Sequence, residues 1–391
     1  MLLTTTAQLA EFCAANAGAD FVTVDTEFMR ERTYWPKLCL VQLGGPSVSV
    51  AVDPLAEGID LKPMFELLAN QKVMKVFHAA RQDVEIFYNL TGTVPQPMFD
   101  TQVAGMVCGY GESASYESLA AALAGAKIDK SSRFTDWSRR PLTEKQIDYA
   151  IGDVVHLRPV YEKLRAQLQK NGREEWVKEE MAILTDPATY NVEPAEIWRR
   201  FKWRADKPRL RALLRELAAW REREAQRLNI PRGRVLRDEA LLEIAHHAPA
   251  NAHDLARTRG LNNGFAESRQ GKEVLEAIAR GNAVPQDQCP TGETRRDLPR
   301  GLGAVMDLLK VLLKQVSEEH GVAAKLIATT DELEQIAADD EAKVPALHGW
   351  RRELFGNLAL ALKRGELALS VKDRKVMALP AGQMPRLPTK D

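Results

Sequence analysis

The stretch FVTVDTEF, residues 21–28, is followed by LCLVQLGG at 38–45 and by SVSVAVDP at 47–54. Short runs rich in Val, Thr and Phe are typical of β-strands, and a GGP turn separates the last two runs. A parallel pair of strands needs a crossover of a dozen or more residues, so strands joined this tightly are largely antiparallel. The stretch therefore predicts the antiparallel part of a β-sheet.

The residues that follow alternate between helical and strand patterns. An amphipathic segment at about 61–68 precedes the strand-like VMKVFHA (73–79), the helix-like RQDVEIFYNL (81–90) and a short segment ending in MFDTQ (98–102). Strand, helix and strand in this order predict parallel additions to the sheet. Helices are expected at YESLAAALAG (116–125) and from Thr143 to about Gln169, where Thr143 and Gln146 suit a capping box. Residues 1–170 are thus predicted to form an α/β domain with a mixed sheet.

Beyond residue 170 the pattern is helical. Residues 171–194 are interpreted as an acidic connector, and an internal repeat follows at a spacing of about 92 residues. The repeat predicts two small all-α domains at 195–282 and 303–370, joined by a linker at 283–302 rich in Pro, Gly and charge and followed by a tail at 371–391. The end of that tail, ALPAGQMPRLPTKD, is expected to be disordered. The repeat rests on Leu217 with Leu309, Leu241 with Leu333, Ile244 with Ile336 and Ala245 with Ala337.

Composition and charge narrow the class of protein. The 54 basic and 54 acidic side chains balance over the chain, but residues 195–281 carry 19 basic and 12 acidic ones, which suits a polyanionic partner as well as a solvated helix surface. No run approaches the length of a membrane span and the N-terminus lacks the pattern of a signal peptide, so a cytoplasmic protein without a membrane partner is expected. The four cysteines form no CxxC pair, which argues against a disulfide framework and a structural zinc site.

Acidic residues in the first domain form a candidate metal site. Asp25 and Glu27 are two apart on a predicted strand and share one face of the sheet. Asp83 begins the helix after the strand VMKVFHA, and Asp153 lies one helical turn after Tyr149. Converging carboxylates repel each other unless divalent cations keep them ionised, and oxygen ligands without Cys or His favour Mg²⁺ or Mn²⁺. Two such ions suit phosphodiester hydrolysis.

Each of these motifs is weak on its own. Asp-x-Glu on a strand occurs often by chance, and an aspartate at the start of a helix usually caps it. Together, however, four segments closely resemble ribonuclease D. They are VDTEFMRERTYWPKLCLVQLG (24–44), VFHAARQDVEIF (76–87), MFDTQVAG (98–105) and FTDWSRRPLTEKQIDYAIGDV (134–154).

The resemblance implies a ribonuclease-H-like exonuclease of the superfamily with four acidic metal ligands. It assigns Asp25, Glu27, Asp83 and Asp153 as ligands of two Mg²⁺ or Mn²⁺ ions and Tyr149 as the residue that orients the attacking water. Because Tyr149 stands four residues before Asp153 and Asp148 fills the alternative histidine position, the chain falls in the Tyr subgroup. The repeated module resembles the helicase-and-RNase-D (HRDC) domain.

The same resemblance implies a 3′-to-5′ exoribonuclease that releases nucleoside 5′-monophosphates. Its expected partners are the RNA 3′ ends of tRNA precursors and other small structured RNAs, with no obligate protein partner. Two alternatives stay open: a 3′-5′ DNA exonuclease of the same superfamily, and a non-catalytic RNA-binding scaffold. The scaffold would have lost a ligand, and none of the four is lost.

Other polar residues have two possible roles. Asp100 is interpreted as a helix N-cap rather than a fifth ligand, and His78 as a residue that packs or hydrogen-bonds at a strand end. Residues 197–204, IWRRFKWR, suit both helix packing and nucleotide stacking. Candidate RNA contacts are Arg139 and Arg140, which precede the catalytic helix, and Arg199 and Arg200.

Overall fold

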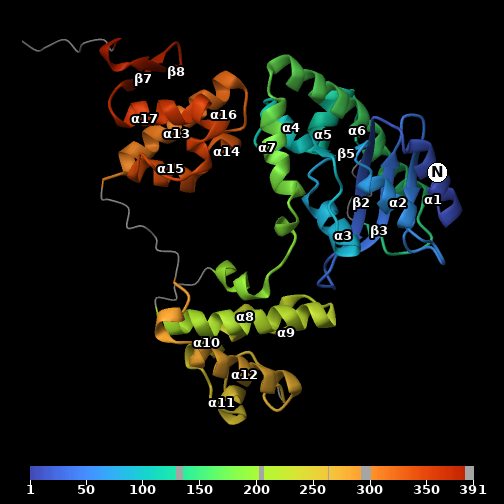
Figure 1. Ribbon diagram of the computed structural model, residues 1–391, viewed down its shortest axis with the longest axis vertical. Helices are drawn as coiled ribbons and strands as arrows, with labels where there is room; N and C mark the ends of the chain where they lie inside the picture. The colour runs from blue at the N-terminus through green and yellow to red at the C-terminus, as the bar shows by residue number, and fades with distance from the viewer. Residues whose placement is uncertain (129–134, 202–206, 263, 292–300, 384–391) are drawn as a thin grey trace, which may run out of the picture.

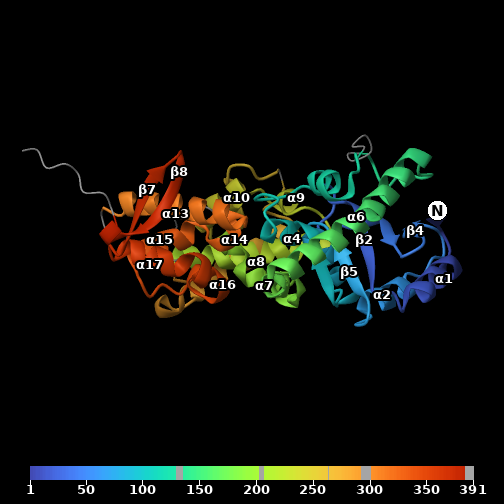
Figure 2. The same cartoon turned by 90° about the horizontal axis from the view of Figure 1, so that it is seen from above.

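The computed structural model describes residues 1–128, 135–201, 207–262, 264–291 and 301–383. It contains an N-terminal α/β domain and two helical units, and α7 (Glu174–Thr185) lies between the α/β domain and the second helical unit (Figure 1). Seen from above, the second helical unit lies on the left and the α/β domain on the right (Figure 2).

A mixed six-stranded sheet forms the centre of the N-terminal α/β domain, as predicted. Its strand order is β1-β4-β3-β2-β5-β6. The β2–β3 and β3–β4 pairs are antiparallel, whereas β5 joins β2 and β6 joins β5 in parallel. Strand β1, which has two residues and runs parallel to β4, was not predicted. The strands are β1 (Leu2–Leu3), β2 (Phe21–Met29), β3 (Lys37–Gly44), β4 (Ser49–Val52), β5 (Met74–Phe77) and β6 (Met98–Asp100).

Helices cover both faces of this sheet. Val22 and Val24 of β2 pack with residues of α1, α2 and α3, while Phe21 on the opposite face packs with Leu157 and Tyr161 of α6. The capping box of Thr143 and Gln146 starts α6, as predicted. The helices are α1 (Thr6–Asn16), α2 (Lys62–Ala69), α3 (Arg81–Thr91), α4 (Thr101–Val107), α5 (Tyr116–Leu119), which continues into a π-helical turn (Ala120–Ala124), and α6 (Glu144–Asn171).

The segment at 171–194 is more than a connector. It contains α7 (Glu174–Thr185), a 3-10 turn (Pro187–Thr189) and the start of another (Pro194–Arg200). Its acidic residues have a structural role, because Glu179 and Glu180 form ion pairs with Arg351 of the second helical unit. Trp176 stacks on Trp350, with ring centroids 4.4 Å apart. Helix α7 therefore connects the second unit to the α/β domain.

The two helical units repeat the same order of helices. All eight residues of the four repeat pairs are buried, and α9 and α14 also stand 92 residues apart. The first unit contains α8 (Pro208–Leu228), α9 (Arg232–Val235), α10 (Asp238–His247), α11 (Ala252–Ala256) and α12 (Arg269–Ala283). The second contains α13 (Gly303–His320), α14 (Ala324–Ile327), α15 (Thr330–Ala338), α16 (Gly349–Arg351), a π-helical turn (Arg352–Gly356) and α17 (Asn357–Lys363).

A β-hairpin follows the second unit, where the sequence predicts a tail. Strands β7 (Leu367–Lys372) and β8 (Lys375–Pro380) pair in antiparallel fashion. Leu367, Leu369 and Ala378 pack on the core of the second unit, so disorder is wrong for residues 378–380. The rest of the predicted disorder falls largely on 384–391, outside the described residues. Short 3-10 turns lie at Gln286–Gln288, Pro345–Leu347 and Ala381–Gln383. Within the described ranges no helix is long and apolar enough to span a membrane.

Candidate active site

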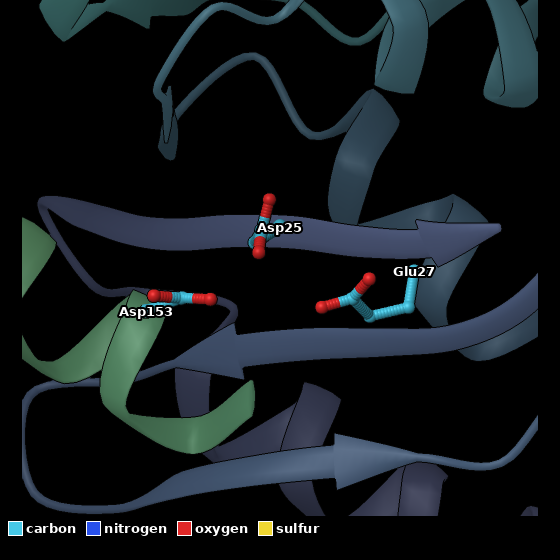
Figure 3. Close-up of side chains that lie close together, drawn as sticks. All are labelled: Asp25, Glu27 and Asp153. Carbon is cyan, nitrogen blue, oxygen red and sulfur yellow. The ribbon is translucent and has the colours of Figure 1, made fainter. Parts of the chain in front are cut away.

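Three of the four predicted ligands converge between β2 and α6. Asp25 and Glu27 lie on the face of β2 that α6 covers, and Asp153 lies on α6. One carboxylate oxygen from each residue lies within 4.8 Å of the others. Figure 3 shows the three side chains around one space.

The close approach of α6 to the sheet places Asp153 there. The hydroxyl of Thr23 on β2 donates a hydrogen bond to the backbone oxygen of Val154 (2.8 Å). Gly44, opposite Thr23 on β3, leaves room for this contact, because a Cβ at that position would lie 2.2 Å from the Thr23 hydroxyl and 3.2 Å from the Val154 oxygen. The residue after Asp153 is thus tied to the strand that carries Asp25.

Asp83 lies next to this cluster but outside it. Its carboxylate, 6% exposed, accepts a hydrogen bond from the Thr26 hydroxyl. Thr26 alternates with Asp25 and Glu27 along β2 and so faces the other side of the strand. The structure therefore brings together Asp25, Glu27 and Asp153 and holds Asp83 beside them.

Asp100 caps α4, as predicted, and also braces the turn before Asp83. Its carboxylate accepts hydrogen bonds from the backbone nitrogens of Gln102 (2.7 Å) in α4 and of Ala79 (3.0 Å) and Ala80 (2.8 Å) before α3. Ala79 has a φ of 56°, a strained value for a residue with a side chain. The Asp100 carboxylate therefore fixes where α3 begins.

Burial makes ionised carboxylates in this site unfavourable unless a positive charge lies nearby. Loss of solvent raises the pKa of Asp25 from 3.8 to about 6. The pKa of Asp83 is raised well above its ordinary value, first by burial and then by the charge of Asp25. Carboxylates in this state ionise fully when a divalent cation replaces the missing solvent. The all-oxygen donor set fits a hard cation such as Mg²⁺ or Mn²⁺.

A cavity of about 440 Å³ opens onto the carboxylates. Asp25, Tyr149 and Asp153 line it, together with His78 and Tyr116. This volume falls in the range of small-molecule and cofactor sites. The predicted water-orienting residue therefore shares one open space with two of the predicted ligands.

Two aromatic residues hold the helical side of this cavity. The Tyr116 hydroxyl donates a hydrogen bond to the backbone oxygen of Asp153 (2.6 Å), and the Tyr149 ring packs against Trp137, with centroids 6.1 Å apart. His78 Nδ1 lies 3.0 Å from the Thr101 hydroxyl, so it hydrogen-bonds at the strand end, as predicted. Tyr116 was not predicted, because its contact with α6 joins residues that are 37 positions apart in the sequence.

Gln42 was also missed. It stands directly opposite Asp25 in the β2–β3 register and is fully buried. Among the described residues its amide nitrogen and oxygen have no hydrogen-bond partner. Buried polar groups without partners are rare and costly, so each one calls for an explanation. A glutamine within a run of Leu and Val is the signal that the sequence offers.

Of the four predicted RNA contacts, Arg140 is engaged within the protein itself. Its five N–H groups are engaged, in a bidentate pair with the buried Asp53 (2.6 and 2.7 Å) and with the backbone oxygens of Cys39, Trp137 and Arg139. No donor is left for a phosphate, because guanidinium carries only five. Arg140 instead pins the loop before α6 to β3 and Asp53.

The other three arginines are exposed. Arg139 has a side chain 84% exposed and forms a long ion pair with Asp136 (3.4 Å). Arg199 pairs with Glu196. Arg200 is exposed at the end of the 3-10 turn before the first helical unit. These positions are open to a ligand.

Comparisons with known proteins agree with this geometry. The family described as 3′-5′ exonuclease matches residues 2–169, and the HRDC domain matches residues 211–278. Ribonuclease D of Nitrobacter hamburgensis is 54% identical over 96% of this chain and 98% of its own length. The chain belongs to the ribonuclease D family. It is a hydrolase with 3′-5′ exoribonuclease activity, the activity of that family.

Further relatives support the same assignment over the whole chain. Ribonuclease D of Granulibacter bethesdensis is 52% identical over 97% of both chains. The crystal structure of Escherichia coli RNase D, described as an exoribonuclease involved in structured RNA processing, superposes with a TM-score of 0.80 at 31% identity. It covers 93% of this chain and 98% of its own. The ribonuclease D architecture therefore includes both helical units.

Proposed function

We propose that this ribonuclease D trims the 3′ ends of tRNA precursors and other small structured RNAs, releasing nucleoside 5′-monophosphates. The observation that carries the proposal is the convergence of Asp25, Glu27 and Asp153 within 4.8 Å, beside the buried Asp83. The E. coli relative acts in structured RNA processing, which supports the substrate class.

The four carboxylates are proposed to hold two Mg²⁺ or Mn²⁺ ions. Burial of Asp25 and Asp83 supports this, because both side chains gain most from a neighbouring positive charge. Two such ions supply an activated water and stabilise the leaving oxygen of a phosphodiester. The protein contributes the fixed positions of the carboxylates, which β2 and α6 set.

Tyr149 is proposed to orient the attacking water. Its side chain lines the same cavity as Asp25 and Asp153, and the contact with Trp137 restricts the ring. A phenol hydroxyl can hydrogen-bond a water without ionising, so Tyr149 acts by position. Tyr116 supports the same helix by holding the backbone oxygen of Asp153.

RNA binding is proposed for the basic first helical unit and for Arg139, Arg199 and Arg200. All three arginines have exposed side chains, and phosphates are the ligands that such residues bind most readily. The prediction that the enzyme works in the cytoplasm without an obligate protein partner stays open.

The experiment is degradation of one tRNA precursor labelled at either end, with and without a chelator, beside a DNA strand of matched sequence. We expect the 3′ label to appear at once as mononucleotide and the 5′-labelled RNA to shorten step by step, with both changes stopped by the chelator. Release of the 5′ label first, or undiminished cleavage in the chelator, would overturn the proposal. Faster degradation of the DNA strand would favour the alternative of a DNA exonuclease.

A further inference from the structure

A second cavity, of about 490 Å³, lies where the exonuclease domain meets the first helical unit. We call it the interdomain cleft. Its walls come from the loop between β2 and β3, the first turn of α3, the segment after α7, and the first helical unit. The residues that matter here are Arg30, Trp35, Arg81, Tyr190, Arg200 and Arg232.

Specific contacts hold the two walls of the interdomain cleft together. The side-chain oxygen of Asn229, which ends α8 in the left-handed conformation (φ 49°), accepts hydrogen bonds from the backbone nitrogens of Tyr34 (3.1 Å) and Trp35 (3.0 Å). The Tyr34 hydroxyl bonds to Glu222, whose side chain is fully buried and also pairs with Arg232. Docking therefore fixes the loop that carries Trp35 in one position.

Four arginines line the interdomain cleft, and carboxylates neutralise two of them. Arg30 is neutralised by a bidentate pair with Glu85 (2.7 and 3.0 Å), and Arg232 by Glu222. Arg81 and Arg200 are exposed, and neither forms an ion pair within the part of the chain that the structure describes. Two cations from different domains thus line the same space, which favours an anionic ligand there.

The interdomain cleft adjoins the carboxylate site. Arg81 stands in the first turn of α3, two residues before Asp83, and Arg30 follows β2 three residues after Glu27. The end of β2 and the start of α3 thus carry residues of the carboxylate site and residues of the interdomain cleft. Trp35 is half-buried beside Tyr34, with ring centroids 4.7 Å apart at an angle of 76°, which restrains its indole as a stacking surface.

We propose that the interdomain cleft binds the single-stranded RNA on the 5′ side of the scissile bond, with phosphates on Arg81 and Arg200 and a base stacked on Trp35. The inference rests on the proposed function, since it needs an RNA 3′ end at the carboxylates. A cavity of this volume accommodates a nucleotide. Alternating cations and aromatic faces are what single strands bind, because the phosphates are evenly spaced and every base has a flat face.

The test compares single-turnover cleavage of single-stranded RNAs from a dinucleotide upward, for the full-length enzyme and its variants. Arg81→Ala and Arg200→Ala should each reduce cleavage of long RNA far more than cleavage of a dinucleotide, because the dinucleotide is too short to enter the interdomain cleft. For longer RNAs, each should lower kcat/KM and reduce the slope of log kcat/KM against log salt concentration by about 1, the loss of one phosphate contact. Arg257→Ala, in the same helical unit but outside the cleft, is the matched control.

Trp35 is tested by a pair of substitutions. Trp35→Leu should lower kcat/KM for long RNA by about tenfold through lost stacking, and Trp35→Phe should restore most of it. Unfolding curves of both variants check that the loop still docks.

The outcomes separate this inference from the proposed function. If the wild-type enzyme does not shorten RNA from its 3′ end, the proposed function fails. If it does, but the Arg81 and Arg200 variants lose equal activity on the dinucleotide and on long RNA, or no more than Arg257→Ala does on long RNA, the assignment of the interdomain cleft is overturned alone.

Discussion

The buried carboxylate of Asp25 should make the stability of the metal-free enzyme depend on pH. Its pKa is 3.8 in an ordinary setting and about 6 in the folded protein. Between these values the folded state binds a proton that the unfolded state lacks, so the free energy of unfolding falls as the pH rises. The difference between the two pKa values corresponds to a loss of about 3 kcal/mol for Asp25, complete above pH 6. The raised pKa of Asp83 acts in the same direction.

Denaturant unfolding of the wild type and of Asp25→Asn, each in chelator and in excess Mg²⁺, measures this effect from pH 4 to 8. Asparagine has nearly the same shape and no charge, so the variant in chelator should be more stable than the wild type at pH 7.5, by up to about 3 kcal/mol. That advantage should vanish toward pH 4. Mg²⁺ should stabilise the wild type at pH 7.5, far less at pH 5, and the variant little at either pH. A variant that is less stable than the wild type in chelator at pH 7.5 would refute the reasoning.

Four further substitutions test single residues. Asp83→Asn can still accept the Thr26 hydrogen bond, so the variant should fold normally. It should lose at least about 100-fold in activity, because replacing residues that only orient metal ligands already lowers activity by about 10- to 100-fold. A variant that keeps a tenth of the wild-type rate in Mg²⁺ would contradict the assignment of Asp83 as a ligand. Arg140→Ala should cost about 3 kcal/mol of stability, since it leaves Asp53 buried without its partner, and should not change RNA affinity. Arg139→Ala should lower RNA affinity and leave the stability unchanged. If the two variants have equal effects in titrations with RNA and in urea unfolding, the two arginines do not have the different roles assigned to them here. Arg351→Ala should lower the free energy of unfolding by about 3 kcal/mol, because it breaks the ion pair with the largely buried Glu180. The single-turnover rate on short RNA should stay constant. A loss of that rate would mean that the second helical unit contributes to catalysis.

The sequence predicts those parts of the site that depend on the spacing of residues within one strand or helix. The two-residue spacing of Asp25 and Glu27 is enough to place both on one face of a strand. The meeting of Asp153 with them depends on how α6 crosses the sheet, which Gly44 and Thr23 permit. Such a contact joins residues more than a hundred positions apart, so only the family resemblance indicated it.

The other differences between the sequence-based expectations and the structure have the same origin. Arg140 stands beside Arg139 in a loop, and nothing in its neighbourhood shows that Asp53 takes up its guanidinium. The hairpin of β7 and β8 turns at Asp373 and Arg374, both with positive φ, where a sequence reader expects Asn or Gly. Without that turn signal, its strands read as part of a tail.

The most direct test of the carboxylate site is the Mg²⁺ dependence of single-turnover RNA cleavage, measured for the wild type, Tyr149→Phe and Asp153→Asn. Tyr149→Phe should lose about 10²- to 10⁴-fold in rate while its half-saturating Mg²⁺ concentration stays unchanged, because it removes only the orientation of the water. Asp153→Asn should lose rate and also need more Mg²⁺. Wild-type rates in Tyr149→Phe, or an unchanged Mg²⁺ requirement in Asp153→Asn, would contradict the account of a metal site built by β2 and α6.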